Sequence, residues 1–199
     1  MTILPALAAL LLAPVASEQD CSYDRDTMLA MDLESFDQQM DAGWRALQAR
    51  GCLAEAAELI AAYREAHPEE AGLLGWHEGQ LRAMLGEREA AVALFAGARK
   101  PEAEDMQGWN AYVDASIAFL ENDRTALEAA RERLAVVPKP EGMDLKMEQP
   151  DGTVLELAWP PNLNVVDGLI DCFGKSYREA YNAPCRSRPS VTVVEPEAQ

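Results

Sequence analysis

The four cysteines are the residues of this sequence with the clearest chemistry. An even number of cysteines in a short, exported chain is typical of disulfides. Four cysteines allow three connectivities, and we favour the local one, in which Cys21 pairs with Cys52 and Cys172 with Cys185. No Cys-x-x-Cys is present and only two histidines could assist, so the spacing fits no zinc site. We therefore expect two disulfides, no metal and no cofactor, with reduced, buried cysteines as the alternative.

Motifs of enzymes are scarce in the chain. His77-Glu78 is followed by Leu81 at the position where the metalloprotease motif has its second histidine. No serine stands in Gly-x-Ser-x-Gly, and no glycine-rich loop follows a strand to hold a phosphate. Acidic clusters at 69–70 and 102–105 lie at the starts of predicted helices, where carboxylates interact favourably with the helix dipole. The sequence thus predicts no catalytic residues and a protein that is not an enzyme.

Residues 1–17 have the features of a signal peptide. An uncharged, mainly apolar run covers residues 4–15, and Val15-Ala16-Ser17 places small residues before a cleavage site after Ser17. The run is shorter than the roughly 20 apolar residues that a membrane-spanning helix needs. We expect this leader to be removed and the mature chain to be periplasmic or secreted, without membrane insertion. A buried N-terminal helix is the alternative.

The formal net charge of the chain is −17. Binding to DNA, RNA or anionic lipid needs basic patches, so this excess of acid argues against a nucleic-acid partner. A solvated acidic surface explains the charge most simply, and a cationic partner is the alternative.

The elements that must position these residues are mostly helices. Ser35 and Gln38 form a capping box at the start of the first predicted helix, and Gly51 ends it. Apolar residues at helical spacing, separated by glycine and proline, then predict further helices of similar length. The six predicted helices, which form three antiparallel pairs, cover residues 35–51, 53–66, 70–85, 87–100, 105–120 and 123–137.

The predicted helix pairs repeat with a period of 35 residues, because Gly51, Gly86 and Glu121 open similar stretches. Small and bulky residues then recur at fixed offsets, most clearly from Gly79 through Ala98. In this spacing residues 36–138 resemble tetratricopeptide repeats (TPR), helix pairs that stack into an array. The match is looser where Trp44 and Arg133 replace small residues, and the period exceeds the family's usual 34 by one. The resemblance implies a mainly α fold, a right-handed array with a concave groove.

The pattern changes after residue 138. Two alternating segments flank Gln149-Pro150-Asp151-Gly152, which predicts a β-hairpin over 143–158. A last helix over 163–181 is expected to cap the open end of the array. The expected organisation is a leader (1–17), an N-terminal arm (18–34), TPR-like repeats (35–138), a hairpin with a capping helix (139–185) and a flexible tail (186–199).

The leading functional hypothesis is an exported, non-catalytic scaffold that binds a protein or peptide in the concave groove. By analogy with the family, the residues that line the groove are Gln38, Asp41, Arg45, Trp76, Gln80, Trp109 and Tyr112. Burial in the core is the alternative for the tryptophans, Trp44 included. A different hypothesis is an enzyme or small-molecule binder with a polar site in the hairpin–helix unit, formed by Asp167, Asp171, Lys175 and Tyr177. A structural spacer between partners is the third.

Overall fold

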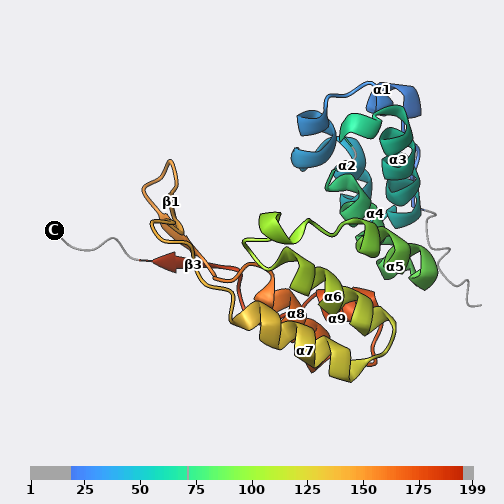
Figure 1. The fold of residues 1–199 in the computed structure, drawn as a ribbon. Coiled ribbons are helices and arrows are strands. Elements are labelled where there is room, and N and C mark those ends of the chain that lie inside the picture. The colour runs from blue at the N-terminus through green and yellow to red at the C-terminus, as the bar shows by residue number, and fades with distance from the viewer. Residues whose placement is uncertain (1–18, 71, 195–199) are drawn as a thin grey trace, which may run out of the picture.

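The computed structural model describes residues 19–70 and 72–194, which form a mainly helical protein with a small three-stranded sheet (Figure 1). The helices of this part of the chain are α1 (Arg25–Leu29), α2 (Gly43–Ala49), α3 (Leu53–Ala66), α4 (Leu74–Leu85), α5 (Arg88–Gly97), α6 (Trp109–Leu120), α7 (Arg124–Ala135), α8 (Leu163–Asp171) and α9 (Tyr177–Tyr181). Shorter helical turns are η1 (Glu34–Gln38), η2 (Pro68–Glu70) and η3 (Glu102–Glu104), and the strands are β1 (Lys146–Glu148), β2 (Val154–Leu157) and β3 (Val191–Val194). The predicted leader lies outside the described residues.

Helices α3 to α7 follow the predicted pattern closely. Consecutive helices pack on each other, α3 on α4, α4 on α5 and α6 on α7. Gly86 ends α4 in the left-handed conformation, with φ of 83°, which glycine adopts without steric cost. Asp123 begins α7, and its side chain accepts a hydrogen bond from the backbone N–H of Ala126. Gly86 and Asp123 therefore set these two helix ends. The acidic clusters at 69–70 and 102–105 were expected at helix starts, but they lie in and beside the turns η2 and η3, and α4 and α6 begin four residues later than predicted.

The first predicted helix is wrong as a single element, because it is broken between η1 and α2. The backbone N–H and hydroxyl of Ser35 are both bonded to the carboxylate of Asp32, so Ser35 does not form the expected capping box. Gly43 begins α2 with φ of 49°, and a Cβ there would collide with the carbonyl oxygen of Phe36. The close approach of the two segments requires glycine at this point.

Both predicted disulfides are confirmed. Cys21 is bonded to Cys52 and Cys172 to Cys185, with Cα–Cα distances of 5.6 and 5.7 Å. The first disulfide joins the N-terminal arm to the start of α3. The arm carries α1 and packs onto the α2–α3 core rather than extending from it.

Two hydrophobic cores meet at α4. Its Leu74 and Leu81 belong to the N-terminal core, while Trp76 and Ala83 belong to the core built from α4 to α9. Because one helix contributes a face to each core, α4 joins the two halves of the helical body. No helix of residues 19–70 and 72–194 is long and apolar enough to span a membrane.

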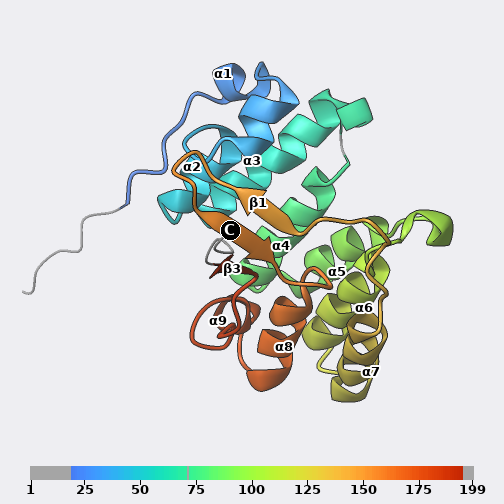
Figure 2. The same cartoon turned by 90° about the vertical axis from the view of Figure 1, so that its left-hand side faces the viewer.

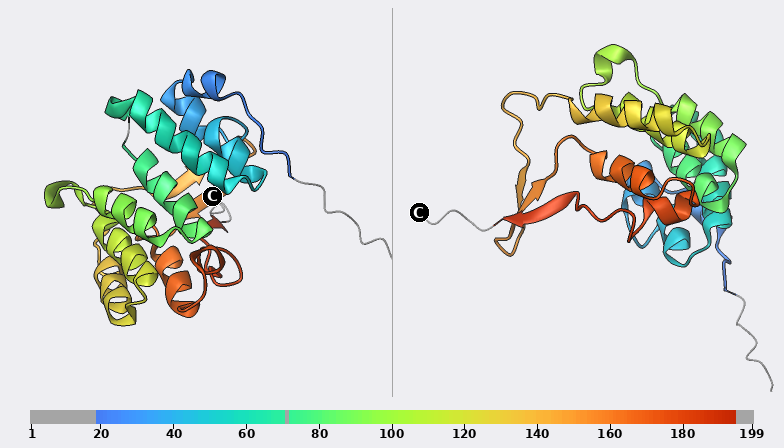
Figure 3. Two further views of the ribbon diagram at one scale, coloured as in Figure 1. Left: turned by 90° about the vertical axis from the view of Figure 1, so that its right-hand side faces the viewer. Right: turned by 90° about the horizontal axis from the view of Figure 1, so that it is seen from below.

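The hairpin is confirmed and is part of a larger sheet. β1 pairs with β2 in antiparallel register, and Gly152 completes the connecting turn with φ of 83°. The expectation of a loose tail is wrong for residues 191–194, which form β3 and pair with the other side of β2. The sheet, in the order β1-β2-β3, projects from the helical body (Figures 1 and 3).

The prediction of a single capping helix over 163–181 is also wrong, because the structure has two helices there, α8 and α9. The chain leaves α8 through a turn in which Gly174 has φ of 86°, and a capping box between Ser176 and Glu179 starts α9. α8 packs on α6 and α7, so it covers the last helix pair as expected. α9 packs on α4 and lies beside α8 (Figure 2).

Candidate functional site

The residues expected to form the centre of a groove lie in the core instead. The side chains of Trp76 and Tyr112 are only 3% and 2% exposed. The ring of Trp76 packs 4.2 Å from Phe95, 4.8 Å from Trp109 and 4.9 Å from Tyr112, measured between centroids. Such contacts stabilise the core. Trp76 and Tyr112 therefore present no exposed surface to a peptide.

Helix α9 packs on α4, where a further expected groove residue lies. The amide of Gln80 donates hydrogen bonds to the hydroxyl of Tyr181 on α9 (3.0 Å) and to that of Tyr112 (3.5 Å). Trp109 is half-buried, and its ring N–H donates to the carbonyl of Ala98 at 2.7 Å. Gln80 and Trp109 are thus engaged in contacts within the chain.

Two of the remaining groove residues, Gln38 and Arg45, contact a buried residue, Asp37. Gln38 and Asp41 are exposed, and the Gln38 amide donates to Asp37 at 2.6 Å. Arg45 donates to the backbone carbonyl of Asp37, and its guanidinium lies 4.3 Å above the ring of Trp44. These residues belong to η1, to α2 and to the segment between them, beside the N-terminal core. Trp76 and Tyr112 belong to the core built from α4 to α9. The structure therefore does not bring the seven expected residues into one site.

Asp37 itself fastens η1 to two helices. Its carboxylate accepts hydrogen bonds from the Trp44 ring N–H and from His77 on α4, both at 2.8 Å. Burial raises the pKa of Asp37, but the hydrogen bond and charge of His77, the Trp44 donor and the charge of Arg45 outweigh it, so the pKa is lowered. The carboxylate is held ionised as an anchor for the local structure.

The four residues of the alternative polar site do not converge. Asp167 is buried and paired with Arg131 and Arg188, whereas Asp171 is exposed. Lys175 and Tyr177 line a separate cleft of about 390 Å³ beside α4 and α6. Burial raises the pKa of Tyr177 well above its usual value. The break between α8 and α9 separates side chains that a continuous helix would have aligned.

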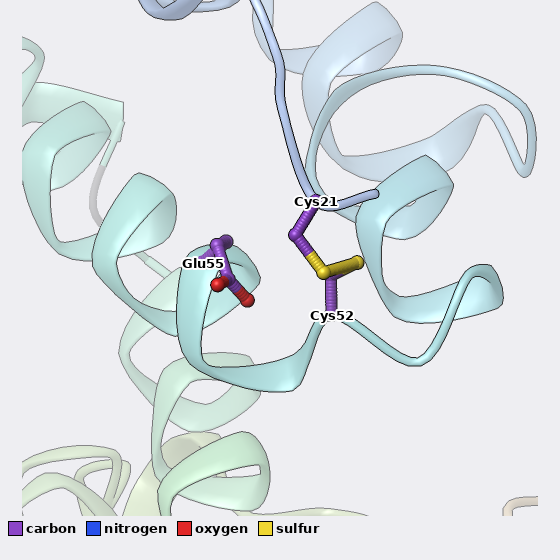
Figure 4. Close-up of side chains that lie close together, drawn as sticks. All are labelled: Cys21, Cys52 and Glu55. Carbon is purple, nitrogen blue, oxygen red and sulfur yellow. A yellow bond between two sulfur atoms is a disulfide. The ribbon is translucent and has the colours of Figure 1, made fainter. Parts of the chain in front are cut away.

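Cys21, Cys52 and Glu55 form a compact group whose ligand atoms lie within 4.8 Å of one another (Figure 4). The two sulfur atoms are joined in the disulfide, and a metal ligand would have to be a thiolate. The group is therefore not a metal site while the disulfide is intact.

The sheet carries an uncovered apolar face. Side chains alternate across a strand, and the register of the three strands places six apolar residues on one side. Val193 is 71% and Met147 45% exposed. An apolar patch of this kind on a projecting element is a candidate interaction site. We call it the apolar sheet face, and its residues are Leu145, Met147, Leu155, Leu157, Val191 and Val193.

The outer edge of β3 is open. The N–H of Ala158 donates to the carbonyl of Ser190 at 2.9 Å, so these opposite residues form a hydrogen-bonded pair. Such pairs alternate with non-hydrogen-bonded ones along an antiparallel ladder. The N–H and C=O groups of Val191 and Val193 therefore point away from β2, and no residue in the described part of the chain pairs with them.

The opposite edge, along β1, is different. Leu157 donates to the carbonyl of Leu145 at 2.9 Å, so the outward residues of β1 are Lys146 and Glu148. Both are charged, and the N–H of Lys146 already donates to the Asp144 carboxylate at 2.9 Å. Charged side chains protect an edge from pairing with other chains. Only the β3 edge combines free backbone groups with uncharged side chains.

A cleft of about 460 Å³ lies at the base of the apolar sheet face. Sheet residues form one wall, Trp159, Pro160 and Pro161 contribute a second, and Arg186 is the cationic residue among those that line it. Its volume is in the range of ligand-binding clefts, which are mostly apolar with few polar groups. The cleft, the apolar sheet face and the β3 edge are contiguous, because Val191 belongs to all three. Together they form the candidate site.

Sequence reasoning missed this site because it assigned residues 186–199 to a tail. Val191-Thr192-Val193-Val194 is a β-branched run that follows Pro189-Ser190, a recognisable strand signal. Comparison with protein-family models, with curated proteins and with solved structures found no match, so the geometry alone carries the functional argument.

Proposed function

We propose that this protein is an exported, TPR-like helical scaffold that binds an extended segment of a partner protein without catalysing a reaction. The segment adds to the outer edge of β3 as a fourth strand, with alternate side chains on the apolar sheet face. The observation that carries the proposal is the open, uncharged edge of β3 beside an exposed apolar face. Backbone hydrogen bonds supply affinity in this mode of binding, and alternate side chains supply specificity.

The asymmetry of the sheet supports this role. Natural proteins protect the edges of sheets with charge, and β1 follows that rule with Lys146 and Glu148. β3 departs from it with Val191, Thr192 and Val193. An unprotected edge invites pairing with another chain, so its retention on a projecting sheet fits a function in binding.

The helical body supports the rest of the proposal. The 35-residue spacing and the paired packing of α3 to α7 favour a TPR-like array. Trp76 and Tyr112 are buried and Gln80 is bonded to Tyr181 of α9, which favours the sheet over the groove as the place of binding. Two disulfides favour an oxidising compartment and hence export.

A proline substitution tests strand addition. Val193→Pro removes an outward N–H and leaves the ladder with β2 intact, because proline is tolerated where the N–H faces solvent. Glu148→Pro makes the same change at the opposite edge. The probe is a fluorescently labelled peptide of alternating threonine and valine with an amidated C-terminus, titrated by fluorescence anisotropy.

We expect Val193→Pro to weaken binding of this peptide by about tenfold or more, and Glu148→Pro to leave it within about twofold. Equal effects of the two substitutions, or retained binding to Val193→Pro, would contradict strand addition at β3. Far-UV circular dichroism of both variants controls for folding.

A further inference from the structure

We propose that the partner segment ends at the cleft, where Arg186 binds its C-terminal carboxylate. This inference rests on the proposed strand addition and specifies its direction and the class of its partner. The partner is a protein whose free C-terminus is extended and ends in an apolar residue.

Arg186 is a cation without a counter-charge. No carboxylate of the described residues lies within ion-pair distance of its guanidinium, whereas the nearby Arg131 and Arg188 are both paired with Asp167. The guanidinium of Arg186 lies 5.4 Å from the ring centre of Tyr181, which holds it in place. An arginine that is half-buried, positioned and unpaired in an acidic protein is suited to bind an anion brought by a partner.

The cleft around Arg186 fits one apolar residue with a terminal carboxylate. Trp159, Pro160 and Pro161 form a wall with few hydrogen-bonding groups, and Leu157 and Val191 continue the apolar sheet face into the cleft. Asp144 also lines the cleft, with its carboxylate engaged by the N–H of Lys146. The cleft thus offers an apolar wall to a side chain, and Arg186 is the cationic residue of its lining.

The direction of β3 selects the C-terminus. β3 runs from Val191, which lines the cleft, to Val194 at the projecting end of the sheet (Figure 1). A strand added antiparallel to β3 runs the other way, so its last residues reach the cleft. A parallel strand would bring its N-terminal ammonium group towards Arg186, and like charges repel. The unpaired arginine therefore favours the antiparallel arrangement, which ends in a carboxylate.

The test compares two forms of one peptide. The labelled threonine–valine peptide ending in valine is used with a free carboxylate and with an amide, and both are titrated against the full chain. Arg186→Gln removes the proposed ligand of the carboxylate. Arg178→Gln is the matched control, because it removes an exposed arginine of α9 that does not line the cleft. Dodecanoate serves as a competitor that carries a carboxylate on an apolar chain without a peptide backbone.

We expect the free acid to bind at least about tenfold more tightly than the amide, since a hydrogen bond to a charged group is worth about 1.5–3 kcal/mol. This preference should disappear in Arg186→Gln and persist in Arg178→Gln. Equal affinity of the two peptides, a preference that survives Arg186→Gln, or tighter binding of dodecanoate than of the acid peptide would overturn the inference.

The variants separate this inference from the proposed function. If Val193→Pro weakens both peptides and Arg186→Gln weakens neither, strand addition holds and the role of Arg186 fails. If Arg186→Gln removes the preference for the acid while Val193→Pro has no effect, the carboxylate site holds and strand addition fails. Failure of both peptides to bind at about 1 mM overturns both.

Discussion

Replacing Gly79 with alanine tests the close packing of α4 on α5, on which the helical body depends. A Cβ at Gly79 would lie 2.8 Å from two ring carbons of Phe95 and 3.2 Å from the Cβ of Leu94. Phe95 is fully buried, and its ring already packs 4.2 Å from that of Trp76. The ring therefore has no free space to move into, so the added methyl group strains the contact.

The expected magnitude follows from two opposing effects. Inserting a methyl group into a well-packed core costs about 1–3 kcal/mol. Alanine in a helix interior gains up to about 1 kcal/mol over glycine. The net loss for Gly79→Ala is therefore about 0–2 kcal/mol in the free energy of unfolding. For a protein of this size a loss of about 2 kcal/mol lowers Tm by roughly 4–8 °C.

Gly97→Ala provides a matched control on the facing helix. Gly97 is the last residue of α5, and a Cβ there would meet no atom within 4 Å. We expect this variant to be as stable as the unsubstituted chain or up to about 1 kcal/mol more stable. Urea unfolding followed by far-UV circular dichroism measures the free energy of unfolding of both variants. The comparison requires that the m-value, the slope of this free energy against urea concentration, is the same for both. If Gly79→Ala proved as stable as Gly97→Ala, the close approach of α4 and α5 would be refuted.

Two further predictions concern the N-terminal carboxylate and the C-terminal disulfide. Trp44→Phe removes a hydrogen-bond donor to the Asp37 carboxylate. The pKa of Asp37 is lower in the folded than in the unfolded chain, so the ionised carboxylate stabilises the fold at pH values above its unfolded pKa. This stabilisation is lost as the pH falls through the pKa of Asp37 in the folded chain. The stability lost by Trp44→Phe should therefore be larger at pH 6 than at about pH 3; an equal loss in urea unfolding at both would contradict this. Replacing Cys172 and Cys185 together with alanine opens a loop with a sequence separation of 13 and should cost about 3 kcal/mol. If the double variant were as stable as the unsubstituted chain in oxidising buffer, this contribution of the disulfide would be contradicted.

Local signals account for the parts of the fold that the sequence predicted. Gly86 and Asp123 carry the conformations that end and begin helices, so they mark boundaries without reference to the rest of the chain. The turn at Gln149-Pro150-Asp151-Gly152 likewise depends on its own residues. These features are encoded within a few residues, which is why the helix pairs and the hairpin were predictable.

The missed features depend on contacts between distant segments. Gly174 and the Ser176–Glu179 capping box are readable signals for the start of α9, but its return to α4 depends on packing that no local pattern shows. The burial of Trp76 depends in the same way on packing between helices, in this case on Phe95 of α5 and on Trp109 and Tyr112 of α6. Trp76 and Tyr112, which were expected to line a groove, are therefore core residues.

The candidate site was hidden for the same reason. The strand propensity of residues 191–194 is visible, but its pairing with β2 spans about 36 residues of chain, as in the register of Glu156 with Thr192. The unpaired state of Arg186 is a property of its surroundings, because Arg188, two residues further along the chain, is paired with Asp167. Residue type alone does not distinguish them.

Amide hydrogen exchange at β3, measured by NMR with and without the threonine–valine peptide, tests the central claim most directly. The outward N–H groups of Val191 and Val193 should exchange quickly in the free protein and become protected on binding, while that of Glu148 stays unchanged. Binding of the peptide without protection of Val191 and Val193, or with changes confined to the helices, would contradict strand addition to this edge.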